Sequence, residues 1–190
     1  MLSEVRETIE TANDERAIQK VLEKHPEILA QHLGGGHGRW VIPQMRLGAE
    51  YIPDFIIGER NSGGFFWHLV ELESPRARLF IQNGDPSLEL RHAIRQVHDW
   101  RAWLTQNQNY ASRPISENGL GLVEIHNRTH GIILIGRRTE VRTDNNPRRR
   151  QMELDNHVTI MSYDRLLEWA QERCDHWTRW RESIQKLVRN

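Results

Sequence analysis

The sequence predicts an α/β domain with a central mixed β-sheet flanked by helices. Segments with a helical spacing of apolar residues alternate with segments rich in aromatic and β-branched residues. Residues 131–136, GIILIG, carry no polar side chain, which is typical of a strand covered on both faces. Because 190 residues have the size of one ordinary domain, we expect a single domain made of N-terminal helices (1–33), a core (39–170) and a C-terminal helical extension (171–190).

The first elements in chain order are helices and then three strands. Residues 2–33 have the helical spacing of apolar residues. Residues 39–48 are predicted to form a strand that Pro43 confines to a sheet edge or a bulge. Residues 51–59 and 65–74 are rich in aromatic and β-branched residues and are joined by RNSGG, so they predict a β-hairpin.

A long amphipathic helix is predicted after Gly84. Residues 85–104 carry an apolar stripe that would pack on the sheet, and Asp85 would be the N-cap, with Pro86 at the first helical position. The remaining predictions are loops at 105–119 and 137–150, strands at 131–136 and 157–163, and a helix at 164–188. These elements complete the predicted mixed sheet.

Composition excludes several classes of protein. The 26 basic and 26 acidic residues cancel, so the chain cannot coat nucleic acid through net charge alone. Cys174 is the only cysteine, which excludes an internal disulfide framework and a cysteine-rich zinc module and fits a reducing compartment. No apolar run approaches the length of a membrane span. We therefore expect a cytoplasmic protein that does not bind membranes.

Three carboxylates lie in the predicted hairpin strands, where a bare negative charge is costly. Glu71 and Glu73 are two residues apart, so they share one face of a strand, with Cα atoms about 6 to 7 Å apart. Asp54 comes from the partner strand and would converge with Glu71. Such a cluster of oxygen ligands suits Mg²⁺ or Mn²⁺. The alternative is a solvated rim, but the preceding run FFWHLV is apolar apart from His68, which favours a central strand and a site.

An ordered set of short motifs makes the chain resemble the PD-(D/E)xK nuclease core. The motifs are IPDF, a strand ending in VELESP, and RQVHDW on the following helix. More narrowly, the chain is similar to the catalytic domain of Shedu antiphage defence proteins, because EKHPEIL precedes this core and VTIMSYDRLLEWA follows it. The resemblance covers about residues 15–170. It implies a restriction-endonuclease-like fold and metal-dependent hydrolysis of DNA phosphodiester bonds in antiphage defence.

The resemblance also implies roles for particular residues. Asp54 would be the metal-binding aspartate and Glu71 the first acid of the ExK element, with Mg²⁺ or Mn²⁺ as the metal. The backbone carbonyl of Leu72 would be a further ligand. Gln96 would match the family's glutamine on the next helix, or it is a solvated side chain on the helix flank. Candidates for the N-terminal acid that completes the site in some members are Glu23 and Glu27.

Glu73 stands where the family has a lysine. A lysine there would orient or deprotonate the attacking water, whereas a glutamate adds negative charge. The chain has no lysine between positions 25 and 185, and arginine cannot be the base because its pKa is too high. Either Glu73 is a general base or an additional metal ligand, with cationic help from Arg76 or Arg78, or the domain is inactive and binds DNA or a protein partner.

A basic segment follows the predicted strand at 131–136. Residues 137–150 contain clustered arginines that can hold DNA phosphates, with strong salt dependence. The alternative is a solvated basic loop. The predicted DNA-binding residues are Arg76, Arg78, Arg137, Arg138, Arg148, Arg149 and Arg150. We also expect a homo-oligomer and a regulatory partner protein.

Overall fold

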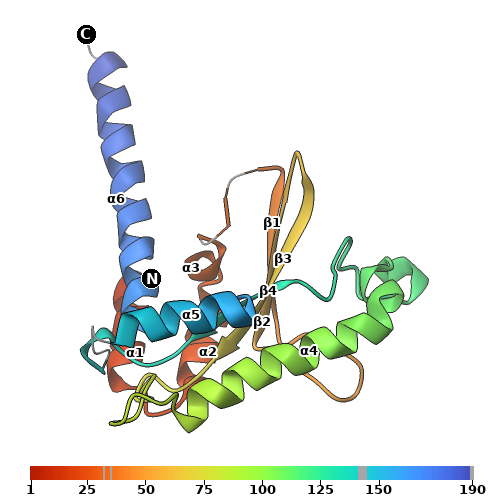
Figure 1. Cartoon of the computed structure of the whole chain (residues 1–190). Helices are drawn as coiled ribbons and strands as arrows, with labels where there is room; N and C mark the ends of the chain where they lie inside the picture. The colour runs from red at the N-terminus through yellow and green to blue at the C-terminus, as the bar shows by residue number, and fades with distance from the viewer. Residues whose placement is uncertain (32, 35, 141–144, 189–190) are drawn as a thin grey trace.

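The computed structural model describes residues 1–31, 33–34, 36–140 and 145–188, and it contains one five-stranded sheet (Figure 1). The strands lie side by side in chain order: β1 (Gly38–Pro43), β2 (Phe55–Asn61), β3 (Gly64–Leu72), β4 (His130–Leu134) and β5 (Val158–Met161). Neighbours are antiparallel from β1 to β3, whereas β4 and β5 run parallel to β3. The predicted mixed sheet is therefore confirmed.

Helices cover both faces of this sheet. They are α1 (Leu2–Thr11), α2 (Glu15–Lys24), α3 (Glu27–Ala30), α4 (Leu88–Ser112), α5 (Asn146–Asn156) and α6 (Tyr163–Val188), with short 3₁₀ helices at Ile115–Glu117 and Arg138–Glu140. Successive residues of β3 point to opposite faces: Leu69 packs with α4, and Val70 packs with α1, α2 and the start of α6. The rest of α6 extends away from the sheet (Figure 1). Among the described residues, no helix is long and apolar enough to cross a membrane.

The predicted hairpin is present and its turn is tight. Asn61 pairs with Gly64, so two residues lie outside the ladder between β2 and β3. β2 begins at Phe55, later than predicted, which leaves Asp54 immediately before the strand. β1 lies at the edge of the sheet, as its proline requires.

α4 differs from the helix predicted at 85–104 at both ends. Ser87 is the N-cap in place of Asp85, because Ser87 Oγ accepts a hydrogen bond from the Leu90 N–H at 3.1 Å. The helix also continues to Ser112, through part of the segment predicted as a loop. This last part is mostly exposed, so it lacks the apolar stripe that marks a helix in a sequence.

The loop predicted at 137–150 contains the start of α5, which begins at Asn146. None of the residues of α5 is fully buried, so the sequence carries no apolar periodicity there. Residues 148–150 therefore lie on a helix, whereas residues 141–144 of the same segment are outside the described residues. This placement matters because three of the arginines predicted to bind DNA belong to α5.

Candidate metal centre

The three carboxylates that the sequence singles out lie together at one end of β3. The pairing of β2 with β3 places Asp54, one residue before β2, beside Glu71. Asp54 Oδ2 accepts a hydrogen bond from the Leu72 N–H at 2.8 Å, which holds this carboxylate against β3. Glu73 follows the last residue of β3. The predicted convergence across the hairpin is therefore observed.

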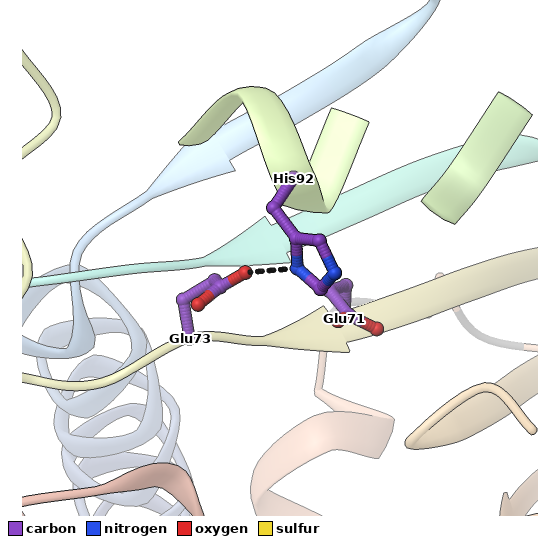
Figure 2. Close-up of side chains that lie close together, drawn as sticks. All are labelled: Glu71, Glu73 and His92. Carbon is purple, nitrogen blue, oxygen red and sulfur yellow. Dashed lines mark hydrogen bonds and ion pairs between the residues drawn. The ribbon is translucent and has the colours of Figure 1, made fainter. Parts of the chain in front are cut away.

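His92 of α4 joins this cluster. Its Nδ1 lies 3.3 Å from Glu73 Oε1, and one ligand atom from each of Glu71, Glu73 and His92 lies within 4.8 Å of the other two (Figure 2). The sequence analysis did not identify this histidine. The available signal was its spacing of four residues from Gln96, which places both side chains on one face of a helix. The structure thus adds an imidazole to the oxygen ligands.

Two uncharged side chains hold the acids in place. Gln96 Nε2 donates a hydrogen bond to Glu71 Oε1, so the glutamine on the helix after β3 contacts the acid directly. The hydroxyl of Tyr163, which is fully buried, donates to the backbone carbonyl of Glu73 at 2.7 Å. The Glu73 N–H in turn donates to the carbonyl of Leu134 on β4 at 2.8 Å. The backbone at Glu73 is therefore fixed from both sides.

In their ionised forms the three acids would repel one another, with little compensation from positive charge. Glu71 is only 5 % exposed, and among the described residues none of the three acids forms an ion pair with a lysine or arginine. Burial, reinforced by the charges of Asp54 and Glu73, raises the pKa of Glu71 to about 10. Burial also raises the pKa of Asp54 to about 6 and that of Glu73 above its ordinary value. A cation bound between them would offset this repulsion.

α2 forms another wall of the centre. Glu15, Gln19 and Glu23 line a cavity of about 470 Å³ that also reaches Asp54. Gln19 Nε2 donates hydrogen bonds to Glu23 Oε1 at 2.8 Å and to the Asp54 carbonyl at 3.2 Å. Of the two predicted N-terminal acids, Glu23 therefore lies at the site, whereas Glu27 lies beside a histidine at the end of α2. Glu15 was missed, although its charge follows burial among the causes that raise the pKa of Asp54.

Arg137 and Arg138, both predicted to bind DNA, form ion pairs with α6. The guanidinium of Arg137 donates to both oxygens of Asp164 at 2.7 to 3.0 Å. Arg138 pairs with Glu168, and its backbone N–H donates to Asp164 at 2.6 Å. Both carboxylates belong to the first turns of α6, so these contacts attach the segment after β4 to that helix. They leave less of either guanidinium available for phosphate.

The other predicted arginines have different surroundings. Arg76 Nε donates to the carbonyl of Ala12 at 3.1 Å, just after α1. Arg148 donates to the carbonyl of Gly84, and its Nη1 lies 3.8 Å from Asp85 Oδ1. Arg78 and Arg150 are exposed, and Arg149 lines a cavity beside β5. No contact of these arginines with the three acids is observed among the described residues.

Basic residues outside the predicted set flank the acids. On α4, Arg91 and Arg95 line a cavity of about 620 Å³ together with Glu73 and the histidine beside it. On α2, Arg16 and Lys20 line the cavity on the Asp54 side. Each pair is spaced by four residues on one helix, so each pair shares a face. The acids therefore lie between two helices that each present a pair of basic side chains, interspersed with the acids Glu15, Glu23 and Glu89.

Comparisons with known proteins identify the family. A search of solved structures matches the structure of SfsA from Pyrococcus furiosus in complex with Ca²⁺, with 17% sequence identity and a TM-score of 0.31, over 77% of this chain and 54% of that chain. This chain thus spans about half the length of the SfsA chain. No curated protein sequence matches. The family described as "Shedu protein SduA, C-terminal" matches residues 12–167, so the chain belongs to the Shedu family.

Proposed function

We propose that the chain is a divalent-metal-dependent DNA endonuclease of the PD-(D/E)xK type that acts in antiphage defence. The observation that carries this proposal is the convergence of Glu71, Glu73 and His92, whose ligand atoms lie within 4.8 Å of one another, beside Asp54. Membership of the Shedu family suggests antiphage defence. DNA as substrate, a homo-oligomer and a regulatory partner protein are parts of the same proposal.

The donor set fits a divalent metal ion. Carboxylate and carbonyl oxygens suit Mg²⁺ and Mn²⁺, and one imidazole is compatible with Mn²⁺. Asp54, Glu71 and Glu73 would hold the metal, with the Leu72 carbonyl as a further ligand and His92 beside them. Bound there, the metal would supply an activated water and stabilise negative charge at phosphorus.

The chain's own residues would position the acids and the DNA strand. Gln96 fixes the rotamer of Glu71 through its hydrogen bond, and Tyr163 fixes the backbone at Glu73. Glu73, in the lysine position, would accept a proton or bind the metal, and His92 would supply the nitrogen that the lysine supplies elsewhere. Arg91 and Arg95, in the adjoining cavity, would bind phosphates next to the reacting one.

The second candidate function is an inactive nuclease-fold domain that binds DNA or a protein partner. The observation that favours it is Glu73 itself, because it adds a third carboxylate where charge at phosphorus must be neutralised. An inactive domain would still retain the basic side chains of α2 and α4 that line the two cavities.

Plasmid cleavage distinguishes the two functions. Wild type, Asp54→Asn, Glu71→Gln and Glu73→Lys would be incubated with supercoiled plasmid and Mg²⁺ or Mn²⁺, with Glu117→Gln, an exposed acid on a 3₁₀ helix, as the control. We expect wild type and the control to nick the plasmid, and the Asp54 and Glu71 variants to lose at least about a thousandfold in rate.

The Glu73→Lys variant decides the role of the anomalous acid. If Glu73 is a ligand or base, the lysine lowers cleavage. Cleavage that appears only in Glu73→Lys would show that the natural site is inactive and would support the second function. Wild type that nicks no better than Glu71→Gln under either metal would refute the nuclease proposal.

A further inference from the structure

We propose that the groove between α5 and α6, along the free edge of β5, is a phosphate-binding site distinct from the metal centre. Within the part of the chain that the structure describes, β5 is the last strand of the sheet, so its outer edge has no neighbouring strand there. Along this edge lies a cavity of about 450 Å³, lined by residues 159–162 of the chain together with side chains of α5 and α6. Its volume falls within the range of small-ligand sites.

Arg149 is the residue of α5 that most directly points to an anion. Its Nε is buried and finds no hydrogen-bond acceptor among the described residues, and its side chain lines the cavity. A buried N–H without an acceptor costs free energy, which an anionic ligand would recover. Its neighbours differ, since Arg148 donates to the Gly84 carbonyl and Arg150 is exposed. The free donor is therefore specific to one of three consecutive arginines.

A second guanidinium faces the same cavity from α6. Arg165 lies over the indole ring of Trp169 at 4.6 Å from the ring centroid, and Glu168 lies 3.8 Å from its Nη1. Stacking restricts the guanidinium to one plane, so less conformational entropy is lost when it binds a ligand. Glu168 also pairs with Arg138, a third arginine of the lining.

The balance of charge around the cavity favours an anion. Three arginines and one acid, Glu153, line it. Two of these arginines already contact Glu168, so the positive charge that has no acid partner among the described residues is that of Arg149. Glu153 Oε1 already accepts a hydrogen bond from the Ile160 N–H of β5 at 2.8 Å, so this acid is held against the strand. Asn146 and Ser162 add uncharged donors to the lining. Planar guanidinium groups with neutral donors between them match the geometry of a phosphate group.

Two sources share this chemistry, namely a free nucleotide and the backbone of a DNA strand. The cavity includes Ser162, which follows the end of β5, as Glu73 follows the end of β3. Since one strand separates β3 from β5, these ends lie roughly 10 Å apart. A single DNA strand could therefore contact both places, and a free nucleotide could occupy the groove alone.

The test measures nucleotide binding without metal. Titration calorimetry in EDTA would compare thymidine 5′-monophosphate with thymidine, using wild type, Arg149→Ala, Arg149→Lys and Arg165→Ala. Arg150→Ala is the matched control, because it removes an exposed arginine from the same helix. We expect the monophosphate alone to bind, Arg149→Ala to weaken binding at least about tenfold, Arg149→Lys to restore part of it, and the control to change it less than about twofold.

Equal binding of thymidine, no binding of the monophosphate, or unchanged affinity in both Arg149→Ala and Arg165→Ala would overturn the proposal. A 5′-phosphorylated tetrathymidylate that binds at least about tenfold more tightly than the monophosphate identifies a strand subsite, and equal affinity identifies a free-nucleotide site. Glu71→Gln should bind the monophosphate as wild type does. A protein that nicks plasmid without binding the monophosphate would therefore refute this proposal alone, and the reverse result would refute the nuclease proposal alone.

Discussion

Two charged regions follow the C-terminal ends of the neighbouring strands β3 and β4, and they differ in whether each charge has a partner of opposite sign. After β4, Arg137 and Arg138 meet Asp164 and Glu168 of α6 nearly one to one. At the end of β3, the acid cluster has no lysine or arginine partner among the described residues. Burial is the main cause of the raised pKa of Glu71, and the charges of the neighbouring acids raise it further. Matched charges hold two segments of the chain together, whereas unmatched charges are available to a ligand.

Among the effects that compare the two regions, the largest is expected on metal affinity at the unmatched cluster. Glu71→Gln removes a negative ligand while preserving size and the contact with Gln96. We expect Mn²⁺ affinity, measured by titration calorimetry, to fall by about a hundredfold or more, because even residues that only support a ligand change affinity by about 10- to 100-fold.

Glu168→Gln is the control for this measurement, because it removes a carboxylate that already has an arginine partner. Its Mn²⁺ affinity should stay within about twofold of wild type. Equal losses of Mn²⁺ affinity in both variants would mean that an arginine partner does not decide which carboxylate binds metal.

The matched region should respond through stability. Arg137→Met leaves the carboxylate of Asp164, which is 23% exposed, without its bidentate partner. We expect a loss of about 2 kcal/mol in the free energy of unfolding by urea, the size of a partly buried charge-assisted contact. Arg150→Met, an exposed residue of α5, should change it by less than about 0.5 kcal/mol. A stable Arg137→Met protein would show that the pair contributes little.

DNA affinity should depend on the arginines beside the acid cluster and not on the paired arginines after β4. Removing both Arg91 and Arg95, which line the cavity beside the acids, should weaken duplex binding in EDTA about tenfold and reduce the slope of log affinity against log salt by about 2. Arg137→Met should leave the slope unchanged, because its guanidinium is occupied by Asp164. Fluorescence anisotropy over a salt series measures the affinity and its salt slope. A slope that falls only in Arg137→Met would show that the basic segment after β4 contacts DNA.

What the sequence predicted well depends on local patterns. The aromatic and β-branched runs on either side of RNSGG predicted the hairpin, and the hairpin alone brings Asp54 beside Glu71. The apolar run before Glu71 likewise predicted a buried strand, and the mixed sheet follows from these runs. Such features follow from residues close together in the sequence, whose side chains recur on one face with a fixed period.

What the sequence did not predict depends on contacts between distant segments. The arginine at 137 reaches an aspartate 27 residues away, and no local pattern shows that a charge is already paired. His92 and Glu15 reach the acid cluster from two different helices, so their roles appear only when the helices pack on the sheet. α5 lacks buried residues, so its helix had no periodicity to find.

The pH dependence of stability should have opposite signs in the two regions. Burial raises the pKa of Glu71 from its ordinary value of 4.5 to about 10. The folded protein therefore binds more protons than the unfolded chain between these values, and the metal-free protein should lose stability as pH rises through this window. Burial acts to raise the pKa of Asp164 as well, but the hydrogen bonds and positive charges of Arg137 and Arg138 together outweigh it and lower that pKa. The stability from this pair should therefore be present at neutral pH and be lost as pH falls below 3.8, the ordinary value for an aspartate.

Thermal unfolding in EDTA from pH 5 to 9 measures the first effect. We expect the melting temperature to fall as pH rises, by about 2 to 4 °C for each kcal/mol of stability lost. The fall should be smaller in Glu71→Gln, because that side chain no longer titrates. Saturating Mn²⁺ should reverse the trend, since the metal binds the deprotonated acids. A wild-type profile that rises with pH and matches that of Glu71→Gln would mean that the acids at the end of β3 are as well compensated as the arginine pairs after β4.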